Sequence, residues 1–195
     1  MIPGWKAWIQ EALADSKSDR SAGYYALATL CGGVPHVRHV VHRGFLRDST
    51  TLVTTTDVRA PKVEEIRAQS AVELAWWIAP AKVQFRISGT ASVLPHAAHV
   101  WRGTEPRDLD AERERVWHAL GPGLQNTFRG APPGISLADA SHAKPPEVDA
   151  SSIPTSFALL LIEPHKVDVL DLTQMKRTVY ERIKEEQWSE TEVTP

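Results

Sequence analysis

Short segments in which apolar and polar residues alternate, or in which β-branched residues gather, predict that the chain folds mainly into β-strands. Gly32-Gly33 separates the first two segments, and short polar turns separate several others, so neighbouring strands are expected to pair as antiparallel hairpins. The candidate strands lie at 24–31, 35–45, 51–57, 72–79, 83–94, 157–163 and 167–172, with 177–183 as the candidate for the last. We expect six to seven strands from these segments, arranged in a small antiparallel barrel of mainly β (α+β) class.

Amphipathic stripes between the strands predict short accessory helices. They are expected at 3–14, 61–69, 96–102 and 109–120. The first belongs to an N-terminal helical segment over residues 1–20. Residues 121–155 are rich in proline and are expected to form a long loop, whereas 184–195 is a polar tail expected to fray. Gly89 inside a strand predicts a bulge or a tight bend.

The composition is that of one domain spanning residues 1–195, with 42% hydrophobic and 24% charged residues. A net charge of −2 argues against a general nucleic-acid coat. No apolar run approaches the roughly 20 residues that span a membrane. The N-terminus lacks a basic start followed by an apolar stretch, so no signal peptide is expected. We therefore expect a cytoplasmic protein without a nucleic-acid or membrane partner.

The cysteine and the histidines do not form a recognisable metal motif. Cys31, the single cysteine, excludes an intrachain disulfide framework, and its apolar strand favours a buried structural thiol over a nucleophile. His36, His39 and His42 alternate faces along a strand, so only His36 and His42 share one, two pleats apart. We expect no metal ion. The sequence also lacks the G-x-G-x-x-G, P-loop and G-x-S-x-G motifs, and no catalytic residue is assigned.

One cluster of cations and hydroxyls carries recognisable chemistry. Arg38 and Arg43 lie on one predicted strand, the next strand ends in Thr-Thr-Thr-Asp, and Arg59 and Lys62 stand where the following helix begins. The N-terminus of a helix attracts anions through its free N–H groups and its dipole, and Arg and Lys add charge-assisted hydrogen bonds. These features predict a phosphate site built without glycines. On the residues alone, scattered basic surface side chains fit equally well.

The chain resembles the FMN-binding split-barrel family of pyridoxamine 5′-phosphate oxidase, and most of all its divergent oxidase-related FMN-binding subfamily. The resemblance rests on four segments in the family's order: RHVVHR (38–43), LVTTTDVRAPK (52–62), ELAWW (73–77) and VQFRISGTASV (83–93). The closing segment FALLLIEPHKVDVLDL is also similar to that subfamily. The resemblance covers most of residues 4–177, with 104–155 the least similar part. It implies a single six- to seven-stranded antiparallel split β-barrel with accessory helices that binds FMN.

The resemblance also implies which residues hold FMN. Arg38 matches the family residue that helps to hold the phosphate, and Gln84 matches a glutamine that hydrogen-bonds the flavin. Lys62 matches the family lysine, but Pro61 stands at the family's arginine position, so Arg59 is expected to supply that charge. Neighbouring matches complete the implied cofactor set: Arg38, Val40, Val41, Arg43, Thr55, Thr56, Arg59, Lys62 and Gln84.

We interpret the chain as an FMN-dependent oxidoreductase of an unidentified small molecule, and the family implies a homodimer with FMN at its two-fold interface. The family oxidase carries an Arg-Leu-His substrate clamp, whereas the comparable stretch here is Arg177-Thr178-Val179, so a vitamin B6 substrate is not expected. Two alternatives remain open. One is a flavin-binding or sensing protein without turnover, and the other is a split barrel that binds haem or a deazaflavin. The retained phosphate-site cations favour FMN over the last two ligands.

Overall fold

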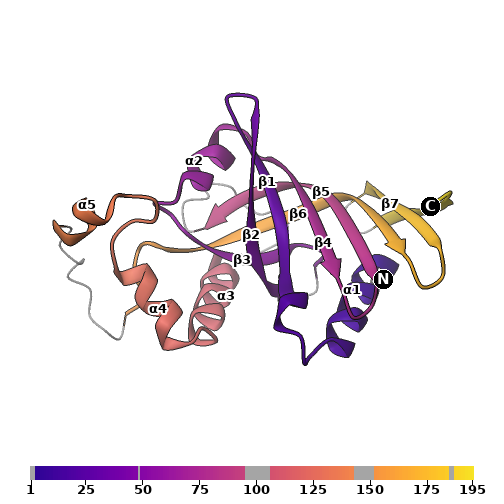
Figure 1. The fold of residues 1–195 in the computed structure, drawn as a ribbon, viewed down its shortest axis with the longest axis horizontal. Helices are drawn as coiled ribbons and strands as arrows, with labels where there is room; N and C mark the ends of the chain where they lie inside the picture. Colours follow the sequence, from indigo (N-terminus) through magenta and orange to yellow (C-terminus); the bar gives the residue numbers. More distant parts are fainter. Residues whose placement is uncertain (1–2, 48, 95–105, 143–151, 185–186) are drawn as a thin grey trace.

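Eight antiparallel strands form one sheet in the computed structural model, which describes residues 3–47, 49–94, 106–142, 152–184 and 187–195. The strands are β1 (Tyr24–Cys31), β2 (Val34–Phe45), β3 (Leu52–Asp57), β4 (Ala71–Ile78), β5 (Val83–Leu94), β6 (Phe157–Asp171), β7 (Lys176–Lys184) and β8 (Gln187–Val193). Their order is β3-β2-β1-β4-β5-β6-β7-β8, and β3 also pairs with β6, which closes β1 to β6 into a barrel (Figure 1). The predicted antiparallel barrel is confirmed: six strands close it, within the six to seven expected, and β7 and β8 extend the sheet beyond it.

One edge of strand β6 pairs with two different strands along its length. Its residues 157–162 pair with β3, and its residues 166–171 pair with β7, while β5 runs along its other side. The β5–β6 register shifts between Ser88 and Gly89. A Cβ at position 89 would lie 2.7 Å from the carbonyl oxygen of Glu163, so glycine is required at this close approach. The predicted irregularity at Gly89 is confirmed.

Apolar side chains pack on both faces of β6. The barrel interior, covered by helix α1 (Gly4–Asp15), contains fully buried side chains that include Trp5, Ile9, Leu27, Trp76 and Phe85. A second cluster packs outside the barrel wall against α3 (Pro106–His118) and α4 (Pro122–Arg129), and it includes Val53, Trp117, Phe128, Phe157 and Leu159. Because successive residues of a strand point to opposite faces, β6 contributes to both clusters and reads as a continuous apolar run.

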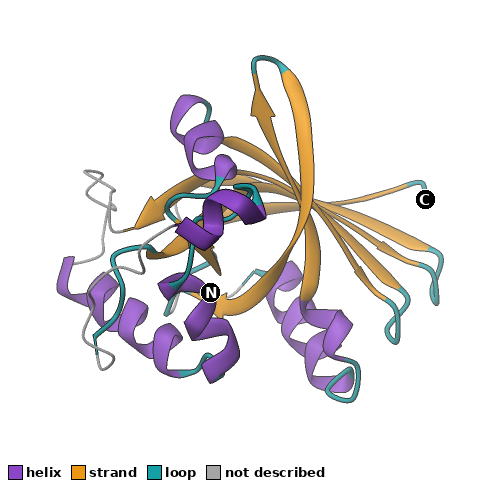
Figure 2. Ribbon diagram, turned by 60° about the vertical axis from the view of Figure 1, so that its left-hand side comes forward, coloured by secondary structure: helices purple, strands orange, loops and turns teal. Residues whose placement is uncertain are grey.

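The proline-rich segment 121–155 is not the loop that its composition predicted, because it contains α4 and α5 (Leu137–His142). Pro122 occupies the first turn of α4, where the missing N–H has no helical partner to lose. Phe128 at the end of α4 packs edge-on against Phe157, with ring centroids 5.0 Å apart. Figure 2 shows these helices gathered at one end of the molecule.

Two further expectations near the C-terminus are wrong. The segments 157–163 and 167–172 form one strand, β6, and the polar tail 184–195 contains β8, which pairs with β7. Backbone pairing with a preceding strand orders β8 even though its side chains are polar. The helix expected at 96–102 lies outside the described residues. A 3₁₀ turn (Arg20–Gly23) leads into β1. Among the helices of the described residues, none is both long enough and apolar enough to cross a membrane.

We expect Gly89→Ala to lower the free energy of unfolding by about 1–3 kcal/mol, because the added methyl group would meet the Glu163 carbonyl and force the backbone to move. The midpoint of urea unfolding, followed by tryptophan fluorescence, measures this loss. Gly23→Ala is the matched control, since nothing lies within 4 Å of a Cβ at that position. Equal midpoints for Gly89→Ala and the unsubstituted chain would show that this close approach does not constrain the sheet.

Candidate functional site

Strands β1 and β2 meet helix α2 (Pro61–Ala68) at one end of the barrel, beside the projecting β1–β2 hairpin (Figure 1). Arg38 reaches from β2 to this helix, where its Nη2 donates to Oε2 of Glu65 at 2.7 Å. Its Nη1 donates to the hydroxyl of Thr29 on β1. Val40, two residues along, is buried in the barrel core. Arg38 and Val40 therefore share one face of β2, as strand alternation predicts.

Glu65 is the anion that holds this end together. Burial by itself would raise its pKa, but hydrogen bonds from Thr29, His36 and Arg38 outweigh burial and lower the pKa to about 2. The carboxylate is therefore ionised at neutral pH and fixes the position of Arg38. Sequence reasoning missed Glu65. Its spacing of one helical turn from Lys62 was the available signal, because residues three apart on a helix are neighbours.

Lys62 stands at the start of α2 beside this pair. Burial lowers its pKa, and the nearby positive charge of Arg38 lowers it further, against the opposing effects of Asp57 and Glu65. Its Nζ lies 3.4 Å from Oγ1 of buried Thr56, at the edge of hydrogen-bonding distance. The N-cap residue of α2, Ala60, supplies no side-chain acceptor to the first turn. Two cations and an uncapped helix N-terminus thus lie together, which is the arrangement that an anionic group would stabilise.

Next to these cations, β2 and β3 are not paired with each other, which leaves an opening in the backbone pairing of the barrel wall. Pairing of the two strands begins only at His42 opposite Thr54, so residues 34–41 of β2 have no strand partner on that side within the described residues. Oγ1 of Thr54 donates to the carbonyl of Val41 at 2.6 Å, where the opening ends. The unpaired backbone of β2 therefore offers hydrogen-bonding groups to a ligand.

Arg59 is engaged elsewhere in this structure. Its Nε and Nη2 donate to the two carboxylate oxygens of Asp57 at 2.9 and 2.6 Å, and its Nη1 donates to the carbonyl of Gly130 at 2.9 Å. This geometry ties the start of α2 to the end of α4. Thr55 points to the face of β3 opposite to Thr56, because successive residues alternate. The assignments of Arg59 and Thr55 to the cofactor stay predictions.

The remaining predicted residues lie on the outer face of the sheet. Val41 and Arg43 alternate with the core residues of β2, and Gln84 on β5 pairs with half-exposed Trp77 on β4. Nε of Arg43 is buried without a hydrogen-bond partner in the part of the chain that the structure describes. Burial lowers the pKa of Arg43. Arg38 and Gln84 thus stand on opposite faces, with β1 and β4 between their strands.

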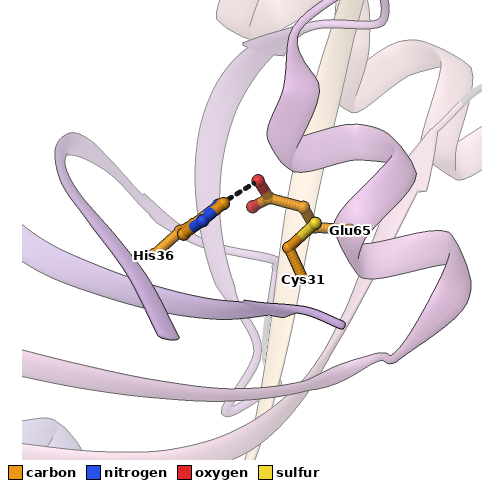
Figure 3. Close-up of side chains that lie close together, drawn as sticks. All are labelled: Cys31, His36 and Glu65. Atoms are coloured by element: carbon orange, nitrogen blue, oxygen red, sulfur yellow. Dashed lines mark hydrogen bonds and ion pairs between the residues drawn. The ribbon is translucent and has the colours of Figure 1, made fainter. Parts of the chain in front are cut away.

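Cys31 is exposed, so the expectation of a buried thiol is wrong. It is the last residue of β1, where the hairpin leaves the barrel. Figure 3 shows its side chain directed toward His36 and Glu65. Nδ1 of His36 lies 2.7 Å from Oε1 of Glu65. The spacing of His36, His39 and His42 along the sequence did not indicate this cluster, because its third member, Glu65, comes from α2.

His42 sits inside the barrel among aromatic rings. Its ring centroid lies 4.8 Å from that of Trp76 and 5.2 Å from that of Phe45. Burial lowers the pKa of His42 to about 4, so the imidazole is neutral at physiological pH. Tyr25, the titratable neighbour on β1, has a pKa raised by burial and is also neutral. Among the described residues, His42 belongs to no group of three His, Cys, Asp or Glu side chains close enough to hold a metal ion.

Comparison with known proteins connects this geometry to a described family. Residues 2–95 match the family model described as the FMN-binding domain of pyridoxamine 5′-phosphate oxidase. This segment contains every residue assigned to the cofactor. The whole chain is 28% identical over 201 residues to pyridoxine/pyridoxamine 5′-phosphate oxidase 2 of Arabidopsis thaliana, covering 98% of that protein.

Solved structures extend the similarity to the whole fold. A pyridoxamine 5′-phosphate oxidase-related, FMN-binding protein from Nostoc punctiforme superposes with a TM-score of 0.83, at 30% identity and full coverage of both chains. PhzG from Burkholderia lata superposes with a TM-score of 0.71 at 18% identity, covering 97% of this chain and 91% of that one. The second likeness concerns the fold alone.

We expect the chain to lose stability as the pH falls from about 6.5 toward 4. The unfolded state binds a proton on His42 near its ordinary pKa, whereas the folded state resists it down to about 4. Over this window, His42 therefore lowers the free energy of unfolding by up to about 1.4 kcal/mol for each unit by which the pH falls. Urea midpoints measured across the window should fall less steeply in His42→Phe. The exposed His39→Ala is the control, and an unchanged slope in His42→Phe would contradict the assignment.

Proposed function

Because the chain belongs to the pyridoxamine 5′-phosphate oxidase-related family of FMN-binding split-barrel proteins, we propose that it binds FMN and is an FMN-dependent oxidoreductase of a small molecule. The observation that carries the proposal is the pair of cations, Arg38 and Lys62, at the uncapped N-terminus of α2. FMN combines an anionic phosphate with a flat amphipathic ring, so a site needs cations at one end and polar backbone beside an apolar wall.

The residues present fit the phosphate end. Burial lowers the pKa of Lys62 most, and the positive charge of Arg38 lowers it further. A phosphate between the two cations would offset both effects. Arg38 is held by Glu65 and Thr29, so its guanidinium is positioned before a ligand arrives. The Thr56 hydroxyl, which donates to the carbonyl of Asp57, lies beside Lys62 as an acceptor for its ammonium group. Pre-positioned cations cost less conformational entropy on binding than free ones.

The opening between β2 and β3 fits the ring end. The unpaired backbone of residues 34–41 offers N–H and C=O groups to the polar edge of the ring. Arg43, whose buried Nε lacks a partner among the described residues, offers a further donor. When bound, FMN supplies the redox chemistry. The chain's own residues bind the phosphate and orient the ring.

The position of Gln84 supports the proposal of a homodimer. Gln84 cannot contact an FMN that is held by Arg38 of the same chain. The strands that carry Arg38 and Gln84 are three strand spacings of about 4.8 Å apart, and the two side chains lie on opposite faces of the sheet. A second protomer resolves this conflict by presenting its Gln84 to the first protomer's cations. Exposed apolar side chains on the outer face, including Tyr24 and Trp77, would then be buried.

The substrate is not a B6 phosphate in this proposal. Arg177, which stands where the family clamp begins, donates to both carboxylate oxygens of Asp168 at 3.0 and 2.8 Å, and Arg86 shares that carboxylate. Because the guanidinium of Arg177 is already paired with Asp168, it is not available to hold a substrate. This favours, as a second candidate, a flavin-binding protein without turnover. Steady oxidation of a reduced nicotinamide by the FMN-loaded chain supports the enzyme, and a bound flavin that no nicotinamide reduces supports the binder.

We expect Lys62→Ala and Arg38→Ala each to weaken FMN binding about 10- to 150-fold, because each removes a charge-assisted contact of about 1.5–3 kcal/mol. Quenching of flavin fluorescence during titration of the flavin-free chain measures the affinity. Arg67→Ala is the matched control, since Arg67 lies on the same helix but is exposed and pairs with Glu64. Unchanged affinity in both test variants would refute the phosphate site, and failure of the unsubstituted chain to bind FMN would refute the function.

Mixed dimers test whether two chains build each site. We expect dimers of Lys62→Ala and dimers of Gln84→Ala to bind FMN weakly. A heterodimer of the two variants should regain one site of full affinity per dimer, because one of its interfaces combines both native residues. Two differently tagged chains, co-expressed and purified through both tags, allow the count by flavin absorbance. A heterodimer without a restored site, or a monomer that retains FMN in light scattering, would contradict a shared site.

A further inference from the structure

We propose that Cys31, His36 and Glu65 form a binding site for a divalent transition-metal ion of the zinc type, at the base of the β1–β2 hairpin. One ligand atom from each side chain lies within 4.8 Å of the others. Figure 3 shows the three side chains converging from β1, β2 and α2. The proposal concerns this chain with or without FMN and does not depend on the proposed function.

The hairpin fixes two of the ligands. Thr29 pairs with His36 and Cys31 pairs with Val34, and residues opposite each other in an antiparallel pair share a face. Cys31 and His36 are therefore diagonal neighbours on the face that α2 covers. The turn between them is Gly32-Gly33, with φ angles of 57° and 83° that only glycine adopts without strain. This tight turn holds the register, and a slip of one residue would move both ligands to the other face.

Helix α2 supplies the third ligand already oriented. Oε2 of Glu65 accepts hydrogen bonds from Thr29 and from Arg38, which leaves Oε1 directed toward His36. Outer contacts of this kind hold a ligating carboxylate in place and commonly change metal affinity 10- to 100-fold when removed. Cys31 and His36 are exposed, so an ion has a path from solvent and water can take a fourth position.

The donor set matches zinc in its chemistry. A thiolate, an imidazole and a carboxylate are the three kinds of protein ligand that zinc takes, whereas calcium and magnesium prefer oxygen alone. The charge also balances, because a zinc ion would replace the thiol proton of Cys31 and the ion, thiolate and carboxylate would sum to zero. The ion would bind on the Oε1 side of Glu65, and Arg38 would keep its contact with Oε2.

The test uses the full chain without an affinity tag and Zn²⁺ or Co²⁺ alone as the probe. We expect competition with a chromophoric chelator to give one tightly bound Zn²⁺ per chain. Co²⁺ in the same site should produce the near-ultraviolet charge-transfer band of a cobalt–thiolate bond, since Cys31 is the only thiol. Cys31→Ser should abolish the band, and both Cys31→Ser and His36→Ala should weaken Zn²⁺ binding at least tenfold.

His39→Ala is the matched control, because His39 is an exposed histidine on the same strand but on its other face. It should leave the ion count and the affinity unchanged. The proposal is overturned by fewer than one ion per chain, by a Co²⁺ complex of the unsubstituted chain that lacks the thiolate band, or by full affinity in both test variants. The Co²⁺ spectrum requires no substitution, so the test survives if a variant fails to fold. Far-ultraviolet circular dichroism checks the fold of each variant.

Discussion

The change of partner along β6 is the constraint on which the remaining architecture depends. One half of this strand closes the barrel against β3, and the other half carries β7 and β8 away from it. Closure through β6 means that β3 does not have to pair with the whole of β2, so the wall stays open beside Arg38. The close approach of Gly89 to Glu163 sits at this divergence, where β5 must follow both halves. The position of the candidate site is thus a consequence of sheet topology rather than of loop insertions.

The charges at the α2 end are organised around one buried carboxylate. Glu65 accepts from Thr29, His36 and Arg38, and these contacts outweigh the cost of its burial. With Glu65 and Asp57 against Arg38, Arg59 and Lys62, this end keeps an excess of positive charge among the described residues. Exposed ion pairs elsewhere, such as Arg67 with Glu64, are worth little because water screens them. The half-buried cations are screened less, so their excess charge is effective toward a ligand.

Much of the barrel could be predicted from the sequence, because its strands obey local rules. Local residue patterns predicted β1, β4 and β5 to within a residue. Strand alternation also explains why Trp76 is completely buried and its neighbour Trp77 is half-exposed. Tertiary contacts decided what the sequence could not show. The α4 helix is stabilised by Phe128 against Phe157, β8 by backbone pairing with β7, and the Cys31 cluster by a residue from another element. No periodicity within one segment reports such partners.

The unpaired backbone of β2 bears on whether the chain associates with itself in solution. A strand edge without a partner is a template for pairing with another molecule, and folded proteins protect such edges with proline, charge or cover. Over 34–41, β2 carries Pro35, which cannot donate to an added strand, and Arg38, whose charge disfavours close stacking. A ligand seated along this edge would complete the protection. The groups that suit the strand for ligand recognition are therefore the same groups that must be kept from self-association.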